Sequence, residues 1–169
     1  MPIRIDADEI RKMCPEYTGT NAHLFQSAAV KGVNILFDHA LLKNINVILD
    51  GTFAYADAMK NIQRSLGKGR IVELWFVYQE PKLAWEFTQV REAVESRRVS
   101  KETFIKGFIQ SRKNVIEAKR SFGDQIELNL LIKNLDNSPG EFKLNVQADE
   151  LDSYLKSDYT EDQLSKLLV

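Results

Sequence analysis

The chain has 169 residues, a length that suits one domain with a core of its own. With 44% hydrophobic and 28% charged residues and only 4 prolines, its composition excludes a disordered or fibrous protein. The net charge of -1 excludes a general nucleic-acid-binding surface, which needs a basic excess to neutralise phosphates.

Cysteines and apolar stretches indicate where such a chain resides. Cys14 is the single cysteine, so an intramolecular disulfide is excluded and a reducing compartment is expected. No stretch approaches the roughly 20 apolar residues of a membrane span, and no basic region followed by an apolar one marks secretion. We therefore expect a cytoplasmic protein without a membrane partner.

Apolar runs and helical spacing alternate along the chain, which predicts one α/β domain with a mostly parallel sheet flanked by helices. The expected elements, in chain order, are a strand that turns helical within 2–11, helix 20–43, strand 46–50, helix 55–66, strand 70–78, a helix from 81, helix 100–122, strand 126–134, a strand candidate over 142–146, helix 149–155 and a helix from 160. Strand 70–78 is nearly continuous in apolar residues, as expected when helices cover both faces of a sheet.

Apolar side chains recur at three- and four-residue spacing in the helices and predict core positions. In helix 20–43 these are Leu24, Ala28, Val33, Leu36, Phe37, Ala40 and Leu41, and in the helix from 81 they are Trp85, Phe87 and Val90. Gly32 interrupts the first set at a cost of about 1 kcal/mol relative to alanine.

Helix ends are marked by residues with known end preferences. We expect Ser100 to cap one helix, Thr160 and Gln163 to form a capping box on the last, and Gly67 and Gly123 to close helices in left-handed conformations.

Two aspartates and an arginine stand where the first strand turns helical. Asp6 and Asp8 are two positions apart, and Arg11 lies about one helical turn beyond Asp8. A carboxylate beside a guanidinium stays ionised, so such an aspartate can orient or deprotonate a hydroxyl group. The alternative is that one of the two only caps the helix from Glu9.

A further acid ends strand 46–50, in the sequence Asp50, Gly51, Thr52. A strand-terminal acid in a nucleotide-binding sheet often serves a metal or a water, and glycine lets the backbone approach a ligand. An ordinary tight turn is the alternative, and the pattern identifies no metal ligand.

Three arginines, Arg91, Arg97 and Arg98, follow in the next helical region. A separation of seven residues is close to two turns, which predicts Arg91 and Arg98 on one helical face. Two guanidiniums on one face can clamp phosphate oxygens, whereas a solvated basic face is the alternative. The phosphate-binding pattern G-x-x-x-x-G-K-[ST] does not occur, because "LGKGR" (residues 66–70) has different spacing.

In their order, "RIDADEIRKMCPEYTG", "NVILDGTF", "IVELWFVYQEP" and "VREAVESRRVSKETF" resemble the zeta toxin family, the kinases of toxin–antitoxin systems. The resemblance extends through about Asn137. Its most specific parts are the Asp-x-Asp-x-x-Arg segment and the strand that ends in Asp-Gly-Thr.

The resemblance implies a P-loop kinase fold that transfers the γ-phosphate of ATP, with Mg²⁺, to a UDP-activated amino sugar such as UDP-N-acetylglucosamine. It implies that Asp8 is the catalytic base. The substrate-binding residues it indicates are Thr52, Arg11, Asn34 and Asp50, with Asn34 in place of the glutamate that family members often carry. The ATP phosphates would contact Arg91 and Arg98.

The family's first strand, glycine-rich loop and lysine precede the first aspartate motif, and seven residues cannot hold them. We therefore expect an N-terminally incomplete kinase core over 1–137, impaired alone, and a C-terminal helical extension over 138–169. ATP and Mg²⁺ would bind once the missing segment is supplied. An antitoxin or that segment is the expected protein partner.

Two other functions fit the same residues. One is a non-catalytic binding or regulatory module, such as half of a split enzyme. The other is a kinase of a different small hydroxyl compound, which substrate screening would identify.

Overall fold

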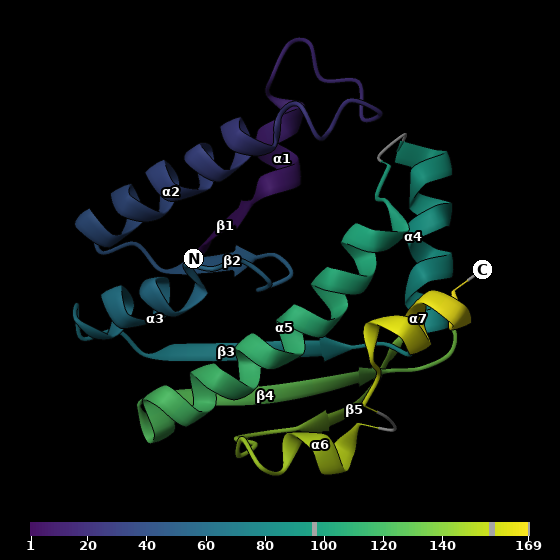
Figure 1. Cartoon of the computed structure of the whole chain (residues 1–169). Coiled ribbons are helices and arrows are strands. Elements are labelled where there is room, and N and C mark those ends of the chain that lie inside the picture. Colours follow the sequence, from purple (N-terminus) through teal and green to yellow (C-terminus); the bar gives the residue numbers. More distant parts are fainter. Residues whose placement is uncertain (96–97, 156–157, 169) are drawn as a thin grey trace. The chain divides into compact units, whose positions relative to one another are not determined.

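The structure is a computed structural model that describes residues 1–95, 98–155 and 158–168. It is an α/β fold, as the sequence predicts, with parallel strands flanked by helices (Figure 1). The elements are β1 Ile3–Asp6, α1 Ala7–Lys12, α2 Gln26–Leu42, β2 Val47–Asp50, α3 Ala58–Leu66, β3 Val72–Tyr78, α4 Pro81–Glu95, α5 Lys101–Phe122, the 3-10 turn η1 Gly123–Gln125, β4 Ile126–Lys133, β5 Pro139–Lys143, α6 Leu151–Tyr154 and α7 Glu161–Leu167.

The chain forms two compact units, which are described separately. Unit 1 comprises Met1–Gly51 and Thr88–Val99, and unit 2 comprises Thr52–Phe87 and Ser100–Val169. In unit 1, β1 and β2 pair in parallel, with Asp6 opposite Asp50 at their carboxyl ends. In unit 2, β3 and β4 pair in parallel and β5 pairs antiparallel with β4. The strands expected in one sheet are thus hydrogen-bonded in two.

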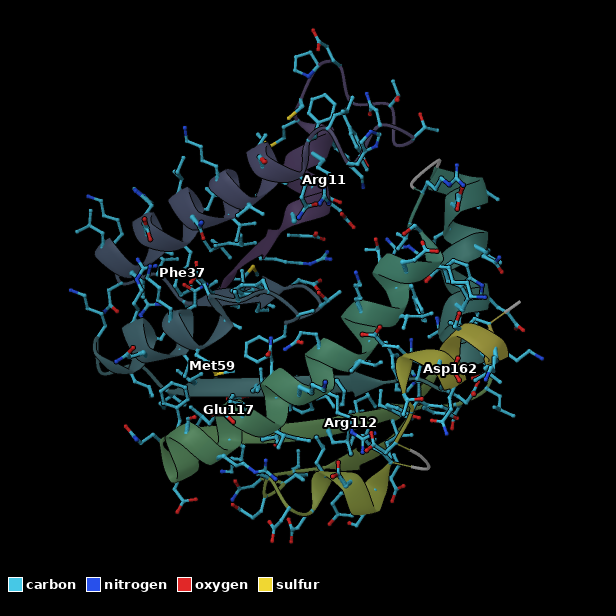
Figure 2. All side chains as sticks on the ribbon, in the orientation of Figure 1. Arg11, Phe37, Met59, Arg112, Glu117 and Asp162 are labelled. Carbon is cyan, nitrogen blue, oxygen red and sulfur yellow. The ribbon has the colours of Figure 1, made fainter. Side chains whose placement is uncertain are left out.

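The core of unit 1 is small, because one helix covers a two-stranded sheet. Ile5 of β1 is buried with Phe37 and Leu41 of α2. Figure 2 labels Phe37 on this helix. The prediction that Leu24 and Leu36 lie in the core is wrong, since both are exposed, as is Ala28. Only one stripe of α2 meets the sheet and α1, so apolar residues beside that stripe stay outside.

Unit 2 has the larger core, and α5 supplies one side of it. Val115 of α5 packs with Leu128 and Leu130 of β4, and Leu151 of α6 joins the same cluster. Figure 1 shows α5 running along one face of the β3–β4 pair. A second cluster joins Trp85 of α4 to Ile105 and to Leu164 and Leu168 at the C-terminal end.

Several predicted helix ends are confirmed and one is wrong. Ser100 caps α5, and Thr160 and Gln163 form the capping box of α7. Gly123 follows α5 with a φ of 52°, but Gly67 has a φ of -63° and keeps a right-handed conformation. The left-handed glycine is Gly69, with a φ of 67°, because the chain continues through one more turn after α3 before it reverses.

Two further sequence expectations differ from the structure. Val90 was expected to point inward from the helix that begins at Pro81, but it is 59% exposed. The strand candidate over 142–146 lies earlier, at β5, and begins two residues after the predicted boundary at 137. The division into 1–137 and 138–169 stays a prediction.

Candidate functional site

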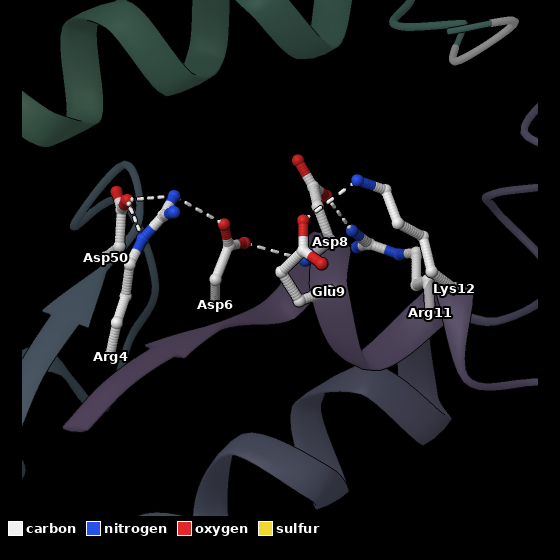
Figure 3. A network of polar contacts seen from close by, with 7 residues as sticks. All are labelled: Arg4, Asp6, Asp8, Glu9, Arg11, Lys12 and Asp50. Carbon is white, nitrogen blue, oxygen red and sulfur yellow. Dashed lines mark hydrogen bonds and ion pairs between the residues drawn. The ribbon is translucent and has the colours of Figure 1, made fainter.

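The carboxyl ends of β1 and β2 carry a group of charged side chains in unit 1. Figure 3 shows Arg4 between two carboxylates, those of Asp6 and Asp50. Its Nη2 lies 2.8 Å from Asp6 Oδ2 and 2.6 Å from Asp50 Oδ2, and its Nε donates a hydrogen bond to the latter. Parallel pairing in register explains the arrangement, since Asp6 is opposite Asp50 and Arg4 precedes Asp6 by two positions on the same face.

Asp6, rather than Asp8, is the cap of α1. Its Oδ1 accepts a hydrogen bond of 2.8 Å from the backbone N–H of Asp8, and its backbone is extended, as an N-cap requires. The capping role that the sequence left open therefore falls on the first aspartate. This leaves the Asp8 side chain to project from the first turn of α1.

Asp8 is held by a buried arginine. Arg11 donates from Nη1 to Asp8 Oδ1 and from Nη2 to Oε1 of Gln26. The exposed fraction is 7% for the Arg11 side chain and 22% for that of Asp8. The Arg11 guanidinium thus fixes the Asp8 carboxylate, while part of the carboxylate faces solvent. This arrangement suits a group that must receive a proton from a bound hydroxyl.

Two residues of this network were missed by the sequence interpretation. Gln26 begins α2 and reaches Arg11 across 15 residues of sequence, and Arg4 joins two strands across 46. Neither link has a local spacing that would indicate it. Alternation along the first strand could have placed Arg4 beside Asp6, but not beside Asp50.

The exposed Arg4 and the buried Arg11 have their charges compensated in different ways. The hydrogen bond that Arg4 donates to Asp50, followed by the negative charge of Asp50, raises the pKa of Arg4 above its ordinary value. Arg4 is therefore a permanent cation between two acids. The Nε of Arg11 is buried without a hydrogen-bond partner, so Arg11 depends on its two terminal nitrogens for compensation of its charge.

The remaining predicted site residues lie in several places. Asn34 is exposed on α2, and Thr52 is exposed two positions after β2, at the start of unit 2. Arg91 is exposed on α4, and Arg98 is exposed beyond it. The structure brings Asp8 together with Arg11, and Asp50 with Asp6 through Arg4.

The shared helical face predicted for Arg91 and Arg98 is not supported. Helix α4 is described to Glu95, and Arg98 is not in a helix. Counting helical turns from Arg91 therefore does not locate the Arg98 side chain. Arg97 lies outside the described residues.

Within the described ranges, no group of three or more His, Cys, Asp or Glu side chains is arranged to hold a metal ion. The acids at the ends of β1 and β2 are instead neutralised by Arg4 and Arg11. Among the same residues, none of the helices has the length and apolar character needed to cross a membrane.

A second polar cluster lies in unit 2, around Arg112 of α5 (Figure 2). Arg112 pairs with Asp152 of α6 at 2.7 Å and with Asp158 at 3.3 Å. A cavity of about 400 Å³ lies beside these residues and is also lined by Lys113 and Tyr159. Acidic and basic side chains both line the cavity, so no single class of ligand is indicated.

Comparisons with known proteins identify the fold. No curated protein matches the chain. The chain is similar to one in a solved structure described as the molecular and structural characterization of the PezAT chromosomal toxin–antitoxin system of the human pathogen Streptococcus pneumoniae. The TM-score is 0.58 at 17% sequence identity, covering 97% of this chain and 70% of that chain. The family model described as Zeta toxin matches residues 1–139, and the chain therefore belongs to the zeta toxin family.

Proposed function

We propose that this chain carries the acceptor site of a zeta-toxin kinase, which transfers a phosphoryl group to a hydroxyl of a UDP-activated amino sugar such as UDP-N-acetylglucosamine. The observation that carries the proposal is the Asp8 carboxylate, fixed by buried Arg11 at the carboxyl end of β1 and still partly exposed. Open α/β sheets bind ligands at this end of their strands. Membership in the family agrees with that placement.

Asp8 would accept a hydrogen bond from the acceptor hydroxyl and orient it, and its carboxylate could take up the proton of that hydroxyl. Arg11 would act on the substrate through Asp8, since its own side chain is buried. Asp50, Thr52 and Asn34 offer polar groups for hydrogen bonds to the sugar nucleotide, and this role is part of the proposal.

ATP would supply the phosphoryl group and Mg²⁺ would offset its charge. The residues present do not fit these groups, because the 169 residues contain no G-x-x-x-x-G-K-[ST] segment and the described acids form no metal cluster. Arg91 and Arg98 are proposed contacts for phosphate oxygens.

Titration of UDP-N-acetylglucosamine by calorimetry tests the acceptor site. Asp8→Asn removes the charge that the proposal requires, and Glu9→Gln removes the same charge from the neighbouring position, where the partner is Lys12 at 2.8 Å. We expect Asp8→Asn to weaken binding at least tenfold and Glu9→Gln to leave it unchanged. Equal heats for the wild type and both variants would show that Asp8 does not meet the sugar nucleotide.

The protein partner belongs to the same proposal. The similar Streptococcus pneumoniae chain comes from a toxin–antitoxin system by its description. We extend this to an antitoxin partner in the cytoplasm for the present chain. Co-expression with the adjacent reading frame and co-purification of the two products would test it, and recovery of the chain alone would contradict it.

A further inference from the structure

The sheet of unit 2 has two faces, and among its described residues those that join the helix-packed clusters lie on the first. We call the second the outer sheet face and define it by its alternating residues: Glu73, Trp75 and Val77 of β3, Glu127, Asn129 and Leu131 of β4, and Phe142 of β5. The alternate residues of β3 and β4, among them Leu74, Leu128 and Leu130, pack against α5 and α6. Trp75 is 46% exposed, Val77 53% and Phe142 52%.

Exposed apolar residues gather on this face. The rings of Trp75 and Phe142 meet edge to face with centroids 6.5 Å apart, and Leu131 lies opposite Phe142 in the register. Crossover connections between parallel strands place helices on the faces of a sheet, and β3 and β4 form the parallel pair of this mixed sheet. A contiguous aromatic and aliphatic patch on a parallel pair therefore marks a surface that another element buries.

The charge beside the patch is negative. Glu73 and Glu127 are register partners on β3 and β4, so two like charges stand side by side on the outer sheet face. Such a pair is destabilising unless a cation neutralises it. Glu73 accepts a hydrogen bond of 3.1 Å from Trp75 Nε1, which holds its carboxylate next to the apolar patch.

We propose that the outer sheet face binds an amphipathic helix of a partner polypeptide. The apolar stripe of that helix lies on Trp75, Val77 and Phe142, and its lysine or arginine side chains lie at Glu73 and Glu127. We choose a helix as the occupant because helices on crossover connections cover parallel strands in α/β folds. We expect a basic end on that helix because Glu73 and Glu127 are register partners on the outer sheet face. A second copy of this chain would bring another acidic pair to the same face.

Two synthetic helical peptides test the proposal. Both are fluorescein-labelled 18-residue sequences of alanine, leucine and glutamine with one leucine stripe; one carries two lysines at one end and the other two glutamates. Binding to the full chain is measured by fluorescence anisotropy. We expect the lysine peptide to bind at least tenfold more tightly than the glutamate peptide.

Variants locate the site and control for stability. Glu73→Gln with Glu127→Gln is expected to bring the affinity ratio close to one, and Val77→Ser to weaken both peptides. Leu135→Ser replaces a residue that is 77% exposed outside the outer sheet face and is expected to change neither. Circular dichroism checks that each variant is folded.

Three results would overturn the proposal. The first is that neither peptide binds, and the second is that both bind equally well. The third is that sedimentation finds a dimer of the wild type that Val77→Ser converts to monomers. The last result would assign the outer sheet face to a second copy.

Discussion

At the scale of single residues, the stability of the candidate site depends on how the buried Arg11 is compensated. The side-chain Oε1 of Gln26 accepts a hydrogen bond from Arg11 Nη2, whereas Arg11 Nε is buried without a hydrogen-bond partner. Gln26→Ala removes one of two acceptors, so we expect the free energy of unfolding to fall by about 1–2 kcal/mol. Urea denaturation measures the change.

Asn34 provides the matched control, because it is a polar residue on the same helix with an exposed side chain. Asn34→Ala is expected to change the stability by less than about 0.5 kcal/mol. Gln26→Glu keeps an acceptor and is expected to retain most of the wild-type stability. Equal effects of Gln26→Ala and Asn34→Ala would mean that the hydrogen bond to Arg11 contributes nothing.

Tyr78 gives the chain a pH dependence at the alkaline end. Burial, followed by its neighbours Tyr159 and Glu80, raises the pKa of Tyr78 to about 12. An unfolded tyrosine ionises near pH 10, so from about pH 10 to pH 12 the unfolded state loses its proton first and is favoured. Below that window the phenol is neutral in both states and contributes no pH dependence.

Comparison with Tyr78→Phe isolates this contribution. Between pH 9 and pH 11 we expect the wild type to lose roughly 1 kcal/mol more stability than the variant, which has no phenol to ionise. Urea denaturation at the two pH values provides the measurement. Parallel losses in both proteins would show that Tyr78 titrates alike in the folded and unfolded states.

The sequence predicted the local part of the site and not the distant part. Asp8 and Arg11 are three positions apart on a helix, and helical spacing alone brings such a pair together. The partners Gln26 and Asp50 come from elements whose placement depends on packing of α2 and pairing of β1 with β2. No pattern within a single element determines those contacts.

At the scale of elements, α1 and α2 approach closely at Gly32. A Cβ built on Gly32 would lie 2.7 Å from Cγ2 of Ile10, so alanine requires either the Ile10 side chain or one of the helices to shift. Gly107 is also within a helix, α5, but a Cβ there meets nothing within 4 Å. We expect Gly107→Ala to stabilise the chain by about 0.5–1 kcal/mol, and Gly32→Ala to bring no gain or a loss. Thermal and urea unfolding measure both.

A double-mutant comparison separates contact from helix propensity. In an Ile10→Ala background the clash is gone, so Gly32→Ala is expected to stabilise by about as much as Gly107→Ala does. A full gain from Gly32→Ala in the wild-type background would show that Ile10 moves aside without cost. Ile10 adjoins Arg11, so the same variant also tests whether the spacing of α1 and α2 matters to the candidate site.

Element types were predictable because periodicity is a local property. The apolar run of β3 and the capping box of α7 were recognised, and both are confirmed. The part of each helix or strand that other elements cover was not predictable, because it depends on how many elements pack against it. The apolar run predicted cover on both faces of β3, yet in the described part of the chain Trp75 and Val77 are half exposed.

At the scale of the whole molecule, the two units contain cores of unequal size. Among the described residues of unit 1, the core cluster holds three large buried apolar side chains, Ile5, Phe37 and Leu41. Unit 2 holds three clusters, which join its helices and its three-stranded sheet. A two-stranded sheet is marginal without further packing, and each large buried side chain contributes about 1.5–3 kcal/mol.

Native-state hydrogen exchange should therefore distinguish the two parallel strand pairs. Amides shared by β1 and β2 are expected to open with a free energy at least about 2 kcal/mol below that of amides shared by β3 and β4. Both pairs are parallel, but β1 and β2 share four register positions whereas β3 and β4 share seven and β4 also pairs with β5, so pairing and side-chain cover both favour the second pair. A single opening free energy for all four strands would mean that the units unfold together, and the difference in their cores would then have no separate effect. A lower value for β1 and β2 would place the Asp8 network on the less stable unit, where the proposed binding of a sugar nucleotide is expected to slow exchange most.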